Sequence, residues 1–498
     1  MKRFWQAMNC LIALLLAGAM AVQPLAAAKK PNKARIELEG QLRAHITELA
    51  SDAYDGREPG TDGEAKTLRY LGKQWFDIGL VSGTNDPANP WFAPVAIIAR
   101  EPDAGRAVFT RKGKRVFVPS NAVLVLTSGK RGLVENAPVL FVGKGAAIPP
   151  RAELAGRVAL LLDGGADNSD RQNALLKGGA SAVITVLDGE RSLENVAAYR
   201  SRKGYALASD KLGGDIEAFI TPAALNGALV GTGLDLAKLQ TQAARPDFAA
   251  KTIDLAVSLE ATTRETRIKT HNLIGKLPGK RPELGAVLLL AHWDHFGECA
   301  EAPAEDLICN GAVDNASGVA VLTEVARRLA KGPQPDRDIY FLATTAEEIG
   351  FLGVEAFAED PPLPLGQIVA AFNIDTVALA PAGRPFAVVG KGMTPLDLQI
   401  AAYAKSVKRP IVENTAANAY VRRQDGWALM RHDVPAVMIS SSWSDIALVE
   451  RFMEGDYHRP GDQLSRGIEL GGAADDVEFL VGLARWFGDA RRVPFGAK

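Results

Sequence analysis

Imidazole and carboxylate side chains recur in the C-terminal half of this chain, at places where the sequence predicts a strand end or a connecting loop. They are His292, Asp294, Asp314, Glu347, Glu348, Asp375 and His458. Two imidazoles with several carboxylates, and no thiolate required, suit Zn²⁺ or a similar divalent ion. Because strand ends in an α/β sheet border one crevice, we expect these side chains to form a single site.

The spacing within this set indicates distinct roles. Neighbouring side chains on an extended backbone point in different directions, so one of Glu347 and Glu348 can bind a metal while the other faces the water as a base. One carboxylate between two ions can bridge them, and two ions about 3.5–4 Å apart can activate a shared water and polarise a carbonyl. Asp294 is placed to hydrogen-bond the second imidazole nitrogen of His292 and fix its tautomer.

Each of these residues also has an ordinary structural explanation. A pair of glutamates usually marks a solvated surface, and Asp314 before a helix can serve only as an N-cap. Asp375 can cap a turn, and His458 can be a plain loop residue. Their joint recurrence at the strand exits of one predicted sheet favours a hydrolytic metal site.

The elements that must position this set alternate between strand and helix. Strands are predicted at 287–291, 339–344, 368–374 and 436–440, and helices at 315–330, 395–405 and 471–487. Such alternation predicts an α/β sheet covered on both faces. Nearer the N-terminus, apolar spacing predicts a helix over 64–80 that ends at Gly79, and then a short strand over 92–99.

The middle of the chain has a different composition. Residues 103–259 form short apolar runs bounded by turns, for example 139–142 and 158–162, and carry no clustered His, Asp and Glu set. We expect a separate, chemically quiet domain there. The predicted division is therefore 1–28, then 29–102 with 260–498 as one discontinuous domain, and 103–259 as an insert.

The first residues and the composition limit the compartment and the partners. Lys2 and Arg3 precede an apolar run at 11–21, and Ala26 and Ala28 give a cleavage pattern, which is typical of a secretory signal peptide. The alternative is a buried or membrane-anchoring first helix. Of 498 residues, 47% are hydrophobic and the net charge is −1, so disorder and a nucleic-acid partner are not expected. We expect a secreted or periplasmic protein without stable membrane insertion after signal removal.

The sequence resembles the co-catalytic di-zinc aminopeptidases of metallopeptidase family 28, which include glutamate-carboxypeptidase-type relatives. The resemblance lies, in order, in the segments 49–60, 291–295, 310–318, 346–348, 372–375 and 456–460. It implies a zinc exopeptidase fold, which is a three-layer αβα sandwich with a central mixed sheet. The middle stretch resembles a mostly-β protease-associated domain, inserted into that fold.

The resemblance also implies a role for each site residue. His292 and Asp375 would hold one Zn²⁺, Glu348 and His458 a second, and Asp314 would bridge both, with Glu347 as general base. It implies a metallo-exopeptidase acting on peptides, most simply an aminopeptidase. The alternatives are a carboxypeptidase or dipeptidase on the same metal site, or an inactive metal-bound binding module.

Two departures from the family pattern bear on the substrate. Gln424-Asp425-Gly426 stands where relatives often have Ser-Asp-His, and Thr376 stands where a Met often follows the ligand Asp375. Tyr420 is a candidate oxyanion contact, with a packed aromatic as its alternative. The other histidines are expected to be structural, with His295 near the site; they are His45, His271, His295 and His432.

Two cysteines lie between the first ligand and the bridging carboxylate. Cys299 and Cys309 are ten positions apart in an acidic loop. Because the implied metal set is complete without sulfur and the expected compartment is oxidising, we predict a disulfide. The alternatives are two free thiols or a thiolate ligand.

Overall fold

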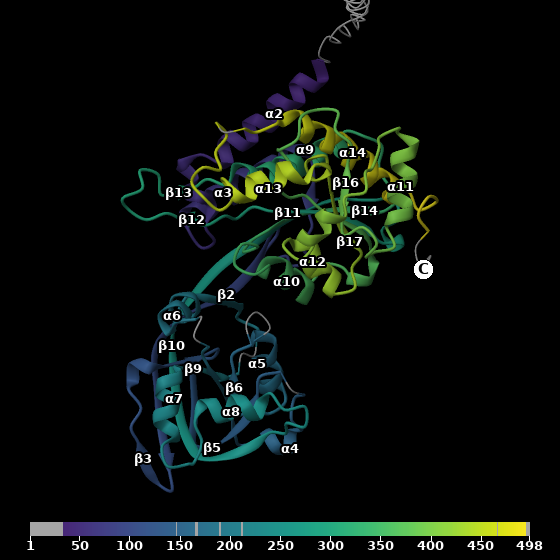
Figure 1. The fold of residues 1–498 in the computed structure, drawn as a ribbon. Helices are drawn as coiled ribbons and strands as arrows, with labels where there is room; N and C mark the ends of the chain where they lie inside the picture. Colours follow the sequence, from purple (N-terminus) through teal and green to yellow (C-terminus); the bar gives the residue numbers. More distant parts are fainter. Residues whose placement is uncertain are drawn as a thin grey trace, which may run out of the picture.

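The computed structural model describes residues 33–145, 147–164, 168–188, 191–210, 213–465 and 467–494. The predicted signal peptide lies outside these residues. Figure 1 shows two lobes joined by the long strands β2 (Phe92–Arg111) and β10 (Lys251–Leu277). We call residues 33–102 and 260–494 the larger lobe and residues 103–259 the insert.

The sheet of the larger lobe is mixed, as predicted. Its strand order is β16-β17-β15-β11-β14-β10, in which β17, β15, β11 and β14 run parallel and β16 and β10 antiparallel to their neighbours. The bounds are β11 Ala286–His292, β14 Asp338–Thr344, β15 Ile368–Asn373, β16 Ala387–Val389 and β17 Ala436–Ser440. β11 and β14 are buried along their whole length, which is why they read as continuous apolar runs.

Helices cover both faces of this sheet. Alternate residues of β11 point to opposite sides, so Leu289 joins one core and Leu288 the other. The first core is closed by α2 Lys33–Leu49, α3 Asp62–Ile78, α9 Gly318–Ala330 and α14 Leu470–Gly488, and the second by α10 Leu352–Glu359 and α12 Asp425–Arg431. The three-layer αβα prediction is therefore confirmed.

This lobe also contains further, mostly short elements. They are η1 Asp52–Arg57, β1 Val81–Ser82, η3 Pro282–Leu284, β12 Gly297–Glu298, β13 Ile308–Cys309, η4 Ala312–Ser317, η5 Leu365–Gln367, α11 Asp397–Ser406, η6 Thr415–Tyr420, η7 Ser442–Ser444 and α13 Ile446–Glu454. As predicted, α3 ends where Gly79 adopts the left-handed conformation, with φ of 92°. No helix among the described residues is long and apolar enough to cross a membrane.

The insert has its own core between strands and short helices. Its strands are β3 Lys114–Val116, β4 Val123–Thr127, β5 Arg131–Gly143, β6 Val158–Leu162, β7 Ala182–Val186, β8 Gly204–Leu207 and β9 Ile216–Ile220. Its helices are η2 Ser120–Ala122, α4 Arg151–Leu154, α5 Asn168–Lys177, α6 Leu193–Arg200, α7 Pro222–Leu229 and α8 Leu236–Ala243. Strands β5, β6, β7 and β9 pair in parallel.

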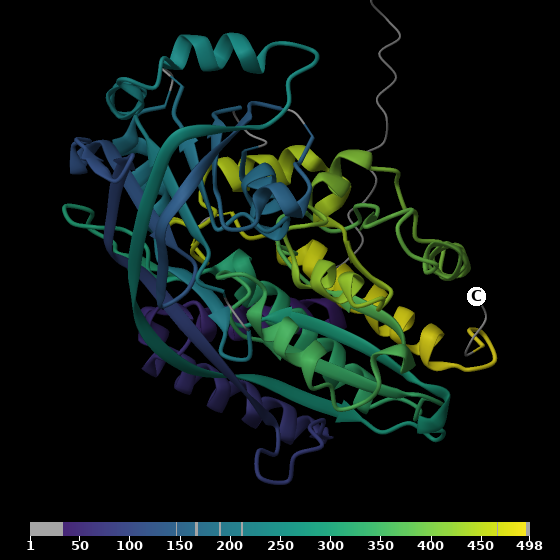
Figure 2. The same cartoon turned by 90° about the horizontal axis from the view of Figure 1, so that it is seen from below.

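The predicted strand at 92–99 is much longer than its apolar run. β2 continues to Arg111 and pairs with β10 along nearly its whole length, with one register shift between Thr262 and Thr263. Both predicted boundaries of the insert therefore fall inside strands (Figure 2). The connecting stretch is polar on both strands and is crossed by ion pairs such as Arg100–Glu265 at 2.8 Å and Arg264–Glu101 at 3.3 Å. Cross-strand pairing replaces apolar burial there, which hides the strand from a search for apolar runs.

A buried glutamate connects two helices of the larger lobe. Glu324 of α9 accepts hydrogen bonds from His45 of α2 at 3.2 Å, from Arg327 at 2.8 Å and from Arg328. Burial alone would raise the pKa of Glu324, but hydrogen bonds from these three partners lower it to about 2. An acid whose pKa falls on folding stabilises the fold above its unfolded pKa and loses that contribution as the pH drops toward its folded pKa.

We therefore expect Glu324→Gln to lower the free energy of unfolding by about 2 kcal/mol at pH 7. The difference from the unmodified protein should shrink between about pH 5 and pH 2, because the unfolded carboxyl becomes protonated there. Urea unfolding of both proteins at a series of pH values measures this difference in the free energy of unfolding. Glu478→Gln, at an exposed position of α14, is the control and should change little; a pH-independent loss in Glu324→Gln would contradict the assignment.

Candidate metal centre

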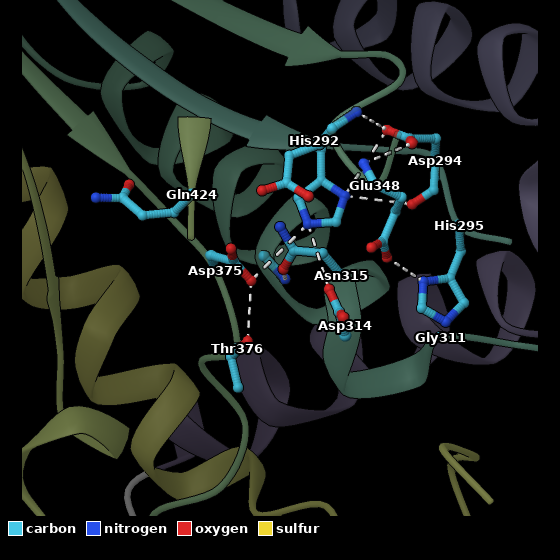
Figure 3. Close-up of polar contacts among 12 residues, drawn as sticks. His292, Asp294, His295, Gly311, Asp314, Asn315, Glu348, Asp375, Thr376 and Gln424 are labelled. Atoms are coloured by element: carbon cyan, nitrogen blue, oxygen red, sulfur yellow. Dashed lines mark hydrogen bonds and ion pairs between the residues drawn. The ribbon is translucent and has the colours of Figure 1, made fainter. Parts of the chain in front are cut away.

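Six of the predicted site residues meet at the carboxyl ends of the parallel strands. His292 ends β11, Glu347 and Glu348 follow β14, and Asp375 follows β15. Asp314 lies in η4, and His458 comes from the loop between α13 and α14. Figure 3 shows His292 pointing toward Asp314 and Asp375. Glu348 lies on the other side of His292 from Asp375, next to His295.

Asp314 lies between the two imidazoles. Its Oδ1 is 3.3 Å from Nε2 of His292, and its Oδ2 is 3.3 Å from Nε2 of His458. Burial alone would raise the pKa of Asp314, but the two neighbouring imidazoles lower it well below its usual range. The carboxylate therefore stays ionised and offers one oxygen to each side.

The outer acids divide between the same two sides. Oδ1 of Asp375 is 3.9 Å from Nε2 of His292, and Oε2 of Glu348 is 3.0 Å from Nε2 of His458. Donor atoms of His292, Asp314 and Glu348 all lie within 4.8 Å of one another. This donor set of imidazoles and carboxylates, in which His292, Asp314 and Asp375 are buried, fits Zn²⁺.

Glu347 occupies the inner side of the acid pair. It is buried, and one of its oxygens lies within 4.8 Å of donor atoms of both His292 and Asp375. Burial and the adjacent acid Glu348 raise the pKa of Glu347 well above its usual value, although His292 opposes this. A carboxyl so placed readily takes up a proton.

Asp294 supports the site differently from the prediction. Its backbone oxygen, rather than its carboxylate, is within hydrogen-bond reach of Nδ1 of His292 at 3.3 Å, and the carboxylate lies 3.8 Å away. The carboxylate instead accepts the backbone N–H groups of Glu347 at 3.2 Å and Glu348 at 3.4 Å. Asp294 thus fixes the turn that carries the acid pair, a contact that only the folded chain creates.

The backbone around Asp314 is also anchored by polar side chains. The Asp462 carboxylate accepts from the N–H groups of Val313 at 2.8 Å and Asp314 at 3.0 Å. Asn315 donates to the backbone oxygen of Ile374 at 3.0 Å, which connects the Asp314 segment to the strand end before Asp375. The wider turn of η4 delays the helix, which begins at Gly318 instead of the predicted residue 315.

Arg57, which sequence reasoning did not single out, holds the loop after His292. Its fully buried guanidinium donates to four backbone oxygens, at 2.6–2.9 Å, of Leu49, Trp293, Asn310 and Gly311. Burial lowers the pKa of Arg57 to about 10, so it remains charged at neutral pH. Beside it, Gly56 has φ of 62°, and a Cβ there would lie 2.5 Å from the backbone oxygen of Cys309.

The predicted disulfide Cys299–Cys309 is present, with a Cα–Cα distance of 5.7 Å. It closes the small hairpin of β12 and β13. The four other histidines have protein partners, as expected of structural residues: His45 with Glu324, His271 with Glu64, His432 with Glu355 and His295 with Glu348. His295 lies closest to the site, since its Nδ1 is 2.5 Å from Oε1 of Glu348.

A narrow cavity opens beside these acids. Asp314, Glu347 and Asp375 line it together with Thr376, Tyr420, Arg423, Gln424, Met438, Trp443, Met453 and Tyr457. Tyr420 lines this cavity, and its ring also packs edge-on against Trp443, so its role as an oxyanion contact stays a prediction. Tyr457 was missed, although its position directly before His458 was a usable signal; its ring stacks on the His458 ring with centroids 3.6 Å apart.

Comparison with known proteins agrees with this geometry. Residues 272–478 match the model of peptidase family M28. This matched region, named here the M28 domain, spans every residue of the candidate metal set, from His292 to His458.

The curated relatives match only over short segments. The alkaline phosphatase isozyme conversion protein of Escherichia coli (strain K12) is 35% identical over 103 residues, which are 19% of this chain and 29% of that protein. Aminopeptidase YwaD of Bacillus subtilis (strain 168) is 32% identical over 126 residues, 25% of each chain. The matches therefore span less than a third of these relatives' lengths.

A solved structure extends the likeness of fold beyond the M28 domain. The aminopeptidase from Aneurinibacillus sp. strain AM-1 aligns with 90% of this chain and 93% of its own, at a TM-score of 0.51 and 18% identity. The zinc exopeptidase fold is thereby shown.

The central place of Asp314 leads to a metal-binding prediction. We expect the zinc-reconstituted protein to retain about two ions per chain after dialysis, Asp375→Ala about one, and Asp314→Ala almost none, because Asp314 faces both halves of the set. Elemental analysis of the dialysed proteins measures this. Glu305→Ala, an exposed acid of the neighbouring loop, should match the unmodified protein. Equal, full occupancy in both Asp variants would contradict two sites that share Asp314.

Proposed function

We propose that this protein is a zinc-dependent metallo-exopeptidase, and specifically an aminopeptidase that releases the N-terminal residue of peptides. The observation that carries the proposal is the place of Asp314 between His292 with Asp375 and His458 with Glu348, inside the M28 domain. The name of the Bacillus subtilis relative, an aminopeptidase, adds support.

The proposed metal set follows the two halves of the site. His292 and Asp375 would hold one zinc ion, His458 and Glu348 the other, and Asp314 would bridge them. Such a pair of ions, when bound, lowers the pKa of a shared water and polarises the substrate carbonyl.

The protein's own groups move the proton and steady the developing charge. Glu347, whose pKa is raised by burial, takes a proton from the attacking water and passes it to the leaving amine. The phenols of Tyr420 and Tyr457 line the same cavity, and an O–H donor there can stabilise the oxyanion. Burial raises the pKa of Tyr457, so its phenol keeps the proton that it would donate.

Export is part of the proposal. It is supported by the signal-like pattern of the first 28 residues. The Cys299–Cys309 disulfide also favours an oxidising compartment.

Matched substrates distinguish the three candidate functions, which are an aminopeptidase, a carboxypeptidase or dipeptidase, and an inactive binding module. Hydrolysis of amino-acid anilides identifies an aminopeptidase, whereas hydrolysis of N-acylated dipeptides identifies a carboxypeptidase on the same site. Zinc retention without turnover of either substrate class would overturn the proposed hydrolysis and favour a binding module.

The adjacent acids should separate chemistry from metal binding. We expect Glu347→Gln to retain its zinc but lose about 10²–10⁴-fold in kcat, since a positioned base contributes that much. Glu348→Gln should instead lose zinc, because it removes a proposed ligand. Turnover on an anilide and metal content are measured on both variants. Near-normal turnover by Glu347→Gln would exclude it as the base.

A further inference from the structure

Arg423 brings a positive charge without an acidic partner to the candidate active-site cavity. It lines the same narrow cavity as Asp314, Glu347 and Asp375. Its side chain is exposed, and no carboxylate in the described part of the chain forms an ion pair with it. An arginine without a partner beside reactive groups has its donors available for a ligand.

Two tyrosines from separate segments hold this guanidinium. Its Cζ lies 5.7 Å from the ring centroid of Tyr420, at the end of η6, and 5.5 Å from that of Tyr457, beside His458. Cation–π contacts of this kind use the flat face of the guanidinium. The N–H donors point outward in the plane, in a fork that matches the two oxygens of a carboxylate.

The backbone beneath Arg423 is fixed as well. Its N–H donates to the backbone oxygen of Tyr420 at 3.0 Å. The next residue, Gln424, is buried, and its Oε1 accepts from Nδ2 of Asn373 at 2.7 Å and from the N–H of Gly426 at 3.0 Å. Gln424 thus ties the Arg423 segment to β15, so the guanidinium is preorganised relative to the candidate metal ligands.

Among the residues that line this cavity, Arg423 is the one basic side chain, and it stands beside the acids Asp314, Glu347 and Asp375. With zinc bound as proposed, the carboxylates would face the metal, and the guanidinium would be the side-chain cation that the cavity offers to a substrate. Met438, Trp443 and Met453 form an apolar part of its lining, suited to the aliphatic part of a substrate.

We propose that Arg423 binds a carboxylate of the substrate and makes the site selective for anionic substrates over neutral ones. This inference rests on the proposed exopeptidase function. The carboxylate belongs either to an acidic N-terminal side chain or to the C-terminus of a dipeptide. Both place the same chemical group on the guanidinium, and the test separates them.

The test compares two matched substrate pairs on zinc-reconstituted protein. Glutamyl and glutaminyl p-nitroanilide differ in a side-chain carboxylate and lack a C-terminal one, whereas Ala-Ala and Ala-Ala-amide differ only in the C-terminal carboxylate. The variants are Arg423→Met, Arg423→Lys and the matched control Arg422→Met. Arg422 is the adjacent exposed arginine, lies 5.2 Å from the Trp427 ring and is not a lining residue of this cavity.

We expect the unmodified protein to prefer the carboxylate-bearing member of one pair. Arg423→Met should lower kcat/KM for that member about 10- to 100-fold, mainly through KM, and change its neutral partner less than about threefold. Arg423→Lys should restore part of the preference, and Arg422→Met should retain all of it. The proposal would be overturned if Arg423→Met lowered kcat/KM equally for both members of the pair, or if it left the preference unchanged.

A binding measurement keeps this inference separate from the proposed hydrolysis. Calorimetry with zinc-loaded Glu347→Gln compares the α-amide of glutamate with the α-amide of glutamine, and Ala-Ala with its amide. Tighter binding of a carboxylate-bearing ligand that Arg423→Met abolishes supports the inference even if no substrate is turned over, which would overturn only the hydrolysis. Equal binding within both pairs, together with turnover, would overturn only the role of Arg423.

Discussion

The contact of one carboxylate, Asp314, with two imidazoles is the interaction on which the site depends. Acids buried this closely repel one another, and burial raises the pKa of Asp294 to about 6 and of Asp425 to about 7. The pKa of Asp314 is lowered instead, because His292 lies next to one of its oxygens and His458 next to the other. Glu348 lies on the His458 side of this carboxylate and Asp375 on the His292 side, which gives the donor set its two halves.

Keeping these charges together requires a rigid backbone around them. Three polar side chains act on main-chain groups rather than on a ligand: Asp294 on the acid pair, Asp462 on the Asp314 segment and Arg57 on the loop after His292. Each satisfies buried backbone groups that loops at strand ends would otherwise leave unpaired. The charge of the site and the order of its loops are therefore maintained by the same network.

The insert also helps to position the acid pair, through the paired strands β2 and β10 and through contacts of the β8 segment. The β2–β10 ladder continues from one lobe into the other, so the insert is carried on paired strands instead of a loose linker. Its strand β8 places Leu207 in a small apolar cluster with Ala346 and Leu352, which flank the Glu347–Glu348 pair. Ser209 adds a hydrogen bond to Glu359 of α10 at 2.8 Å. The acid pair is thus braced from the insert side as well as by Asp294.

The sequence by itself determined the main strands, the stop of α3 at Gly79 and the identity of the residues that could hold metal. Buried parallel strands must be apolar throughout, and metal donors belong to a few residue types, so both leave local marks. The disulfide could also be predicted, because the two cysteines lie only ten positions apart in the sequence. The tertiary structure decided the relations between distant segments. These are the full length of β2, the hydrogen bonds of Arg57 to four backbone oxygens, the backbone role of Asp294 and the approach of Arg423 to the rings of Tyr420 and Tyr457. A polar ladder or a buried arginine has no local signature, because its partners lie up to 254 positions away, as Gly311 does from Arg57, and only the folded chain brings them within hydrogen-bond distance.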